Sequence, residues 1–223
     1  MPLQPSPRGI AALKALLFLA CLLPAASLAW DAWHDALGAN PIEAVTRGLG
    51  DWTLNLLLVT LTVTPLRRLT GWAWLIRLRR MLGLYTFFYA CLHVTSYVWF
   101  DQFFDWTAIA KDIVKRPFIT AGFVGFSLLL PLAATSNNAM VRRLGGRRWQ
   151  RLHRSVYAIA IIGVLHYAWM VKRDLALPLV YAAVAAVLLG LRAWWREQER
   201  RRQLAGAYLP KRRGRVIPIS VKP

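Results

Sequence analysis

The sequence predicts an all-α membrane protein, a six-helix transmembrane bundle with both termini in the cytoplasm. Apolar stretches long enough to cross a bilayer, about 20 residues each, recur along the chain. The 223 residues are 57% hydrophobic, yet they carry a formal net charge of +19. The basic residues gather in alternate connecting segments, which is typical of the cytoplasmic side of a membrane protein. The basic excess therefore indicates topology, and a nucleic-acid partner is not needed to explain it.

The expected spans follow one another closely along the chain. The first resembles a signal peptide, because Arg8 and Lys14 precede an apolar run and the small residues of 25–29. We expect it to be retained, since the run is long and further spans follow directly. The second is short and is expected to be broken by Thr60, Thr62, Thr64 and Pro65. In order, the spans are expected at about 11–30, 52–66, 81–100, 117–134, 152–171 and 176–195.

The distribution of charge sets the expected orientation. The N-terminal tail, the 67–80 and 135–154 segments and the tail from Arg192 hold most of the 29 basic residues. Of the 10 acidic residues, these segments contain only Glu197 and Glu199. The positive-inside rule places them in the cytoplasm, and the tryptophans lie near the expected interfaces, as amphipathic rings prefer.

Two histidines lie at matched depth inside expected spans. His93 is about 12 residues, or roughly 18 Å, into the third span, and His166 is about 14 residues into the fifth. An imidazole in hydrocarbon is costly and indicates a functional role. A haem with two axial imidazoles is favoured over a bond to a neighbouring helix or a proton relay. Zinc or copper is disfavoured because no third ligand is expected at that depth.

The other two histidines are less informative. His153 lies at the inner edge of the fifth span, about 13 residues and roughly 140° around an ideal helix from His166. The side chains of His153 and His166 would lie on the same face of the helix only if the helix were irregular, for instance near Gly163. His153 is either a ligand of a second, inner haem or another cofactor site, or an interfacial histidine. His34 lies in an acidic outer loop and is expected to be solvated.

Arginines gather at the inner helix ends, where they could bind haem propionates or a flavin phosphate through their planar forks. The alternative is that they only follow the positive-inside rule. The inner arginines in question are Arg79, Arg80, Arg147 and Arg148.

Cys21 and Cys91 both lie inside spans, so neither a disulfide framework nor a zinc site is expected.

A haem protein without catalytic domains is expected to carry electrons between other proteins. The tail after Trp195 is about 28 residues, too short for a nucleotide-binding domain. The chain is therefore predicted to be a non-catalytic electron-transfer subunit. The alternatives are a self-contained membrane ferric or quinone reductase, and a transporter that relays protons. The transporter is disfavoured because the span interiors are expected to hold no charged residue.

Several stretches are similar to the MsrQ (YedZ) family, the haem-binding membrane subunits of the bacterial periplasmic protein-methionine-sulfoxide reductase system. The resemblance runs from about Leu22 to Leu191 and implies a ferric-reductase-like transmembrane domain in the bacterial inner membrane. The stretches that carry it are 40–68, 77-RLRRMLGLYTFFYACLHVTSY-97, 115-KRPFITAGFVGF-126, 135-TSNNAMVRRLGGRRWQRLHRSVY-157 and 163-GVLHYAWMVK-172.

The resemblance also implies cofactors and partners. It implies b-type haem, a flavin mononucleotide (FMN), and a heterodimer with a periplasmic molybdopterin-containing catalytic subunit that reduces methionine sulfoxide in oxidised proteins. Electrons would come from the quinone pool or from a cytoplasmic flavin reductase. The only other partner expected is membrane lipid, and no nucleic acid is expected.

The family's functional residues transfer position by position. The family's haem-iron ligands match His93, His153 and His166, and its paired arginines match Arg79 and Arg80; Arg148 is a further cofactor-binding candidate. NADPH-oxidase domains carry four haem histidines and this chain lacks one on the third span, so one or two haems remain open. The expected domains are a six-span haem-binding unit over 1–195 and a basic cytoplasmic tail over 196–223.

Overall fold

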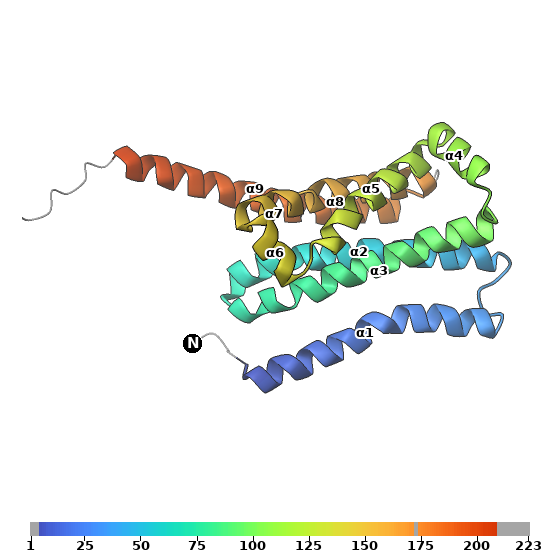
Figure 1. Cartoon of the computed structure of the whole chain (residues 1–223), viewed down its shortest axis with the longest axis horizontal. Helices are drawn as coiled ribbons and strands as arrows, with labels where there is room; N and C mark the ends of the chain where they lie inside the picture. Colours follow the sequence, from blue (N-terminus) through green and yellow to red (C-terminus); the bar gives the residue numbers. More distant parts are fainter. Residues whose placement is uncertain (1–4, 172–173, 209–223) are drawn as a thin grey trace, which may run out of the picture.

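The structure, a computed structural model, describes residues 5–171 and 174–208, and within these ranges every regular element is helical (Figure 1). The predicted six-span all-α architecture is confirmed: six helical segments in the described chain are long and apolar enough to cross a membrane. They are Pro7–Trp33, Pro41–Thr70, Ala73–Asp101, Pro117–Ala134, Gly146–Val171 and Ala176–Ala205.

Individual elements divide some of these spans. The third begins with a 3₁₀ turn, η1 (Ala73–Arg77), and ends in a π-helical turn, η2 (Tyr97–Asp101). The remaining elements are α1 (Pro7–Trp33), α2 (Pro41–Thr70), α3 (Arg79–Ser96), α4 (Trp106–Lys115), α5 (Pro117–Ala134), α6 (Asn138–Leu144), α7 (Gly146–His153), α8 (Val156–Val171) and α9 (Ala176–Tyr208).

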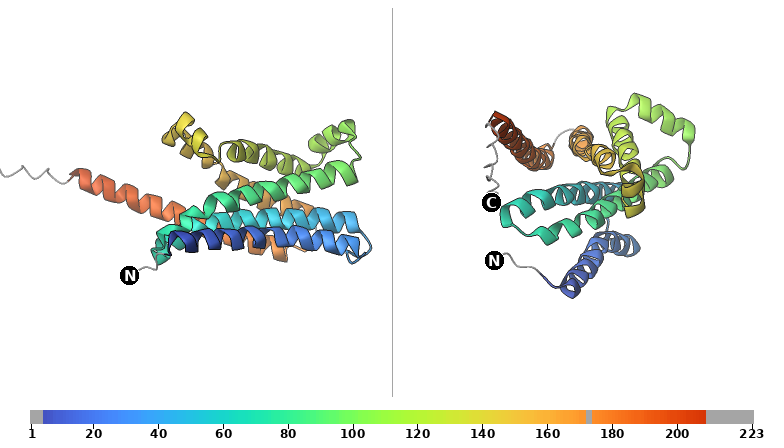
Figure 2. Two further views of the ribbon diagram at one scale, coloured as in Figure 1. Left: turned by 60° about the horizontal axis from the view of Figure 1, so that its bottom comes forward. Right: turned by 60° about the vertical axis from the view of Figure 1, so that its left-hand side comes forward.

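The helices pack around α2. On one side α2 contacts α1, η1 and α3 through a cluster that includes Leu56, Leu82 and Tyr89. On the other side a second cluster joins α2 to α3, α5, α8 and α9 and includes Leu61, Ile159 and Leu188. The beginning of α1 and the end of α9 lie at the same end of the bundle, as an even number of spans requires, and α9 projects beyond the other helices there (Figures 1 and 2).

The second span differs from its prediction, because it forms one uninterrupted helix of 30 residues. Proline has no N–H, so Pro65 leaves the carbonyl of Leu61, four residues earlier, without its helical donor. Arg192 from α9 donates a hydrogen bond to that carbonyl and, at 2.8 Å, another to the carbonyl of Leu188. A neighbouring helix thus supplies the missing donor, which is how transmembrane helices tolerate proline.

A tyrosine bonds to the backbone of α1 beside Pro24. The Tyr89 side chain of α3 is fully buried, and its hydroxyl lies between two backbone groups of α1. It donates to the carbonyl of Cys21 at 2.7 Å and accepts from the N–H of Ala25 at 3.0 Å. Because hydrocarbon offers no alternative partner to a polar group, these bonds fix α1 against α3.

The connecting segments contain more structure than the sequence indicated. The segment between the third and fourth spans includes α4, whose first turn is capped by the carboxylate of Asp105, 2.9 Å from the N–H of Thr107. Phe103 and Phe104 precede it with positive φ angles of 45° and 62°, a conformation that costs energy for bulky residues. These residues lie in the turn that connects η2 to α4.

The fifth span is irregular, but not at Gly163. The helix is broken by a turn at Arg154–Ser155, so His153 ends α7 whereas His166 lies on the separate helix α8. The expected angle of about 140° between the two histidines assumed one continuous helix, and it therefore does not apply.

The sixth span is longer than expected, since α9 continues through the expected domain boundary at residue 195 as far as Tyr208. Residues 209–223 of the basic tail lie outside the described residues.

Candidate functional site

The imidazoles of His93 and His166 meet inside the bundle. His93 is on α3 and His166 is on α8, and the centres of their rings lie 6.1 Å apart with the ring planes at 79° to each other. Both residues are partly buried. The two imidazoles, which come from residues far apart in the sequence, thus lie at the same depth in the bundle. That depth is nearer to the end opposite to η1.

Each imidazole is held by a backbone carbonyl of the neighbouring helix. Nδ1 of His93 lies 2.8 Å from the carbonyl oxygen of Thr46 on α2, and Nδ1 of His166 lies 2.6 Å from that of Phe118 on α5. A carbonyl oxygen can only accept a hydrogen bond, so Nδ1 must carry the proton in both rings. In the neutral imidazole this leaves a lone pair on Nε2.

A glycine gives each ring access to its carbonyl. Gly50 follows Thr46 by four residues and Gly122 follows Phe118 by four, so each glycine shares a helix face with the carbonyl that its histidine reaches. A Cβ at Gly50 would lie 3.1 Å from Cε1 of His93, and one at Gly122 would lie 3.0 Å from Cε1 of His166. Any larger residue would therefore crowd the imidazole, which would have to give by a few tenths of an ångström.

His153 has a different environment. Its Nε2 lies 3.0 Å from the Thr135 hydroxyl, and its ring stacks on that of Trp149 with 3.9 Å between ring centres. Thr135 also donates to the carbonyl of Pro131 at 2.6 Å, so the hydroxyl proton is already engaged and Nε2 acts as the donor. The nitrogen that is free for a ligand in His93 and His166 is hydrogen-bonded in His153.

The candidate arginines do not form one cluster around a histidine. Arg79 is the first residue of α3. Arg80 points towards α6 and donates to the Asn138 side chain at 2.6 Å, and Arg148 is exposed on α7. His34, expected to be solvated, is exposed and lies 2.8 Å through Nδ1 from the carbonyl of Trp30.

The expectation that the span interiors hold no charged residue is wrong. Arg192 lies within the sixth span and is only 8% exposed, with its guanidinium 5.6 Å from the centre of the Tyr157 ring. Asp51 is partly buried within the second span, one residue after Gly50. The charge distribution in the sequence assigned Arg192 to the cytoplasmic tail. The signal that could have found its role is Pro65, because a proline within a helix leaves one carbonyl without its N–H donor and another helix can then supply one.

The donor set at His93 and His166 fits a haem better than a bare metal ion. No group of three or more His, Cys, Asp or Glu side chains in the described part of the chain could hold a metal. A tetrahedral zinc site needs three or four protein ligands, whereas haem iron needs only its axial ligands because the porphyrin supplies the others. A metal-ligating histidine typically donates its other N–H to a carbonyl or carboxylate, as both rings do here.

Comparison with known proteins identifies the family of the chain. Residues 48–164 match the family described as "Ferric reductase like transmembrane component". The chain is 61% identical over 201 residues to a protein of Azospira oryzae, a match that covers 90% of this chain and 84% of the relative. It is 57% identical over 202 residues to one of Herminiimonas arsenicoxydans, covering 90% and 93%. Both relatives are named protein-methionine-sulfoxide reductase heme-binding subunit MsrQ. No solved structure matches the chain.

The six spans and the family match define a multi-pass membrane protein of the ferric-reductase-like class. The matched region contains His93 and ends two residues before His166. Within that class, the chain belongs to the MsrQ family. The resemblance inferred from the sequence is therefore confirmed, and an inner-membrane location is consistent with it.

Proposed function

We propose that this chain is the haem b-containing electron-transfer subunit of an inner-membrane methionine-sulfoxide reductase system, in which His93 and His166 would hold the iron of one haem. The observation that carries the proposal is the pair of imidazoles 6.1 Å apart, each with its Nδ1 on a backbone carbonyl. The printed name of the relatives, a heme-binding subunit, supports the same cofactor.

The spacing of the two rings suits one shared iron. An imidazole nitrogen lies about 2.0 Å from a metal that it binds, so two rings that held one metal between their Nε2 atoms would have their centres roughly 6 Å apart. The observed separation is 6.1 Å. Thr46 and Phe118 hold the Nδ1 protons and so keep both Nε2 lone pairs available for iron.

A haem held there would supply one-electron redox chemistry. The chain would orient both imidazoles through the two carbonyls and shield the site within the bundle. We propose that electrons come from the quinone pool or from a cytoplasmic flavin reductase. They would pass to a molybdopterin-containing periplasmic catalytic subunit in a heterodimer. The word "subunit" in the relatives' name supports a separate catalytic partner, and the basic segments support an orientation with both termini in the cytoplasm.

A second site is proposed at the opposite, basic end of the bundle. His153 and the arginines Arg79, Arg80 and Arg148 would serve there as ligands for a second haem or for the phosphate of FMN. To ligate iron through Nε2, His153 would have to give up its bond to Thr135. We also propose that the transmembrane unit comprises residues 1–195 and that 196–223 form a basic cytoplasmic extension, of which the first part continues α9.

Absorption spectroscopy of the purified chain tests the proposal. We expect redox-active Soret and α bands in the wild-type protein. Their intensity should fall at least about tenfold in His93→Ala and in His166→Ala. The reason is that loss of a residue that only supports a ligand already lowers metal affinity roughly 10- to 100-fold, and loss of the ligand itself should lower it more. His34→Ala is the matched control, because His34 is exposed and also has its Nδ1 on a carbonyl. Full haem content in both ligand variants would refute the assignment.

Co-purification distinguishes an electron-transfer subunit from the alternative, a self-contained reductase. The chain should co-purify with a periplasmic molybdoenzyme and pass electrons to it when reduced. A purified chain that reduced ferric iron or quinone at comparable rates without any partner would favour the self-contained enzyme.

A further inference from the structure

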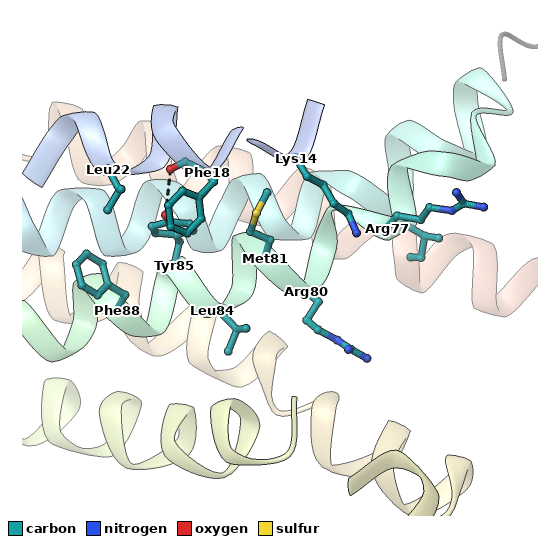
Figure 3. Close-up of a pocket in the computed structure, with 10 residues that line it drawn as sticks. Lys14, Phe18, Leu22, Arg77, Arg80, Met81, Leu84, Tyr85 and Phe88 are labelled. Carbon is teal, nitrogen blue, oxygen red and sulfur yellow. Dashed lines mark hydrogen bonds between the residues drawn. The ribbon is translucent and has the colours of Figure 1, made fainter. Parts of the chain in front are cut away.

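A groove lies between α1 and α3 at the basic end of the bundle. It has a volume of about 700 Å³ and is lined along its length by apolar and aromatic side chains, including Phe18, Leu22, Leu84 and Phe88. Arg80 and Phe88 lie eight residues apart on α3, which corresponds to about 12 Å of helix. The hydroxyl of Tyr85 at its centre is already engaged, since it donates to the carbonyl of Phe18 at 3.0 Å (Figure 3).

Three cations gather at one end of this α1–α3 groove. Lys14 comes from α1, Arg77 from η1 and Arg80 from the start of α3, whereas Leu22 and Phe88 mark the other end (Figure 3). No acidic residue lines the groove, and none of the three cations forms a salt bridge within residues 5–171 and 174–208. The charges are therefore uncompensated by the parts of the chain that the structure describes.

This pattern specifies an amphiphile with an anionic head and hydrocarbon chains. A neutral quinone head would gain little from the positive charge of Lys14 and Arg77, whereas a phosphate can interact with both; Arg80 is turned towards Asn138 of α6. Basic pockets between transmembrane helices are suited to anionic lipid head groups, each cation near the surface adding to the attraction. The apolar walls continue from the cations towards the bilayer centre, which is the direction that acyl chains take.

We propose that the α1–α3 groove is a binding site for an anionic phospholipid, with its phosphate at Lys14 and Arg77 and an acyl chain along Phe18, Leu84 and Phe88. The lipid would fasten α1 to the bundle beside the bonds of Tyr85 and Tyr89. This site is separate from His93 and His166, so its test does not depend on the proposed haem function.

Native mass spectrometry of the full-length protein, with phosphatidylglycerol and phosphatidylcholine offered at equal concentration, tests the site. We expect selective retention of phosphatidylglycerol. In the double variant Lys14→Gln/Arg77→Gln its affinity should fall about 25-fold, because each cation contributes about a fivefold change. The matched control is Arg142→Gln/Arg143→Gln on α6, which removes two exposed charges outside the groove and should leave retention within about twofold.

A second variant separates the groove from charge alone. Leu84→Trp fills the apolar channel without changing charge, and we expect it to displace the lipid. Leu19→Trp places the same ring on α1 at a residue that is 60% exposed and does not line the groove, and it should not.

Three outcomes would overturn the proposal: equal retention of the two lipids, equal losses in both arginine-containing double variants, or an unaltered affinity in Leu84→Trp. Retention of a neutral short-chain quinone in preference to phosphatidylglycerol, unaffected by Lys14→Gln/Arg77→Gln, would assign the groove to a quinone instead. The absorption spectrum, recorded on the same samples, reports separately on the haem.

Discussion

Gly50 on α2 and Gly122 on α5 occupy equivalent positions beside the imidazoles of His93 and His166. In each case the carbonyl that binds the histidine Nδ1 lies four residues earlier, at Thr46 or Phe118. A Cβ introduced at either glycine would approach Cε1 of its histidine almost equally closely, to 3.1 Å at Gly50 and 3.0 Å at Gly122. The chain thus builds the same support twice, from two pairs of helices.

Replacement of these glycines should therefore weaken the haem site without removing a ligand. In Gly50→Ala or Gly122→Ala the added methyl group crowds the imidazole and strains its hydrogen bond to the carbonyl. We expect about 10- to 100-fold weaker haem binding, as for other losses of supporting contacts around a metal ligand. Haem titration of the apoprotein measures this. Gly190→Ala is the control, since a Cβ there meets nothing within 4 Å; wild-type affinity in both site variants would contradict the inference.

His153 should contribute less to haem content than His93 and His166. Its Nε2 is bonded to Thr135 and its ring is covered by Trp149. We expect His153→Ala to retain most of the haem that a pyridine haemochrome assay detects. Complete loss of haem in this variant, with normal helical content, would show that His153 ligates the principal haem.

The bond from Arg192 to Leu61 should be coupled to Pro65. Arg192→Leu leaves the Leu61 carbonyl without a donor, and a buried unsatisfied carbonyl costs about 1–3 kcal/mol. In a Pro65→Ala background the helix regains its own N–H donor, so the same substitution should destabilise the protein less. We expect a coupling free energy of about 1–2 kcal/mol from unfolding in detergent.

Arg196→Leu provides the control for this cycle. The guanidinium of Arg196 also lies over the ring of Tyr157, at 5.3 Å, but Arg196 makes no hydrogen bond to Leu61 within the described residues. Its effect on stability should be the same in the wild-type and Pro65→Ala backgrounds. Equal coupling for Arg192 and Arg196 would mean that the proline-freed carbonyl is not the reason for the buried arginine.

Tyr89→Phe should loosen α1. The substitution removes the hydroxyl that bridges the Cys21 carbonyl and the Ala25 N–H, and a net loss of about 1 kcal/mol is expected. Hydrogen exchange should increase in α1 and not in α8. Tyr167→Phe is the control, because the Tyr167 hydroxyl makes no hydrogen bond within the described residues; equal exchange in both variants would argue against the role of Tyr89.

The positions of the spans were accessible from the sequence because hydropathy is a sum over each segment. The fourth span was predicted at 117–134, as observed, and the depth of His93 and His166 followed from counting residues into their spans. The second span was misjudged because Pro65 was interpreted as a break. Its helix persists because Arg192, from the distant helix α9, supplies the donor.

The supporting glycines carried a weak sequence signal. In 46-TRGLG-50 and 118-FITAG-122 a glycine follows, by four residues, the residue whose carbonyl accepts the histidine bond. Glycine is common in transmembrane helices, however, and this spacing alone selects no site. The role of Gly50 became apparent only when α3 was seen to place His93 against it.

The sequence by itself determined that the chain crosses the membrane six times, and it singled out two histidines at one depth. Only the tertiary structure decided that those rings face each other, that His153 bonds to Thr135, and that Arg192 supplies the donor that Pro65 lacks. The physical reason is that local composition governs transfer of each helix into lipid. The rotation of helices about their axes depends instead on close packing and hydrogen bonds between segments, since lipid is as apolar as the bundle interior and leaves little periodicity to interpret.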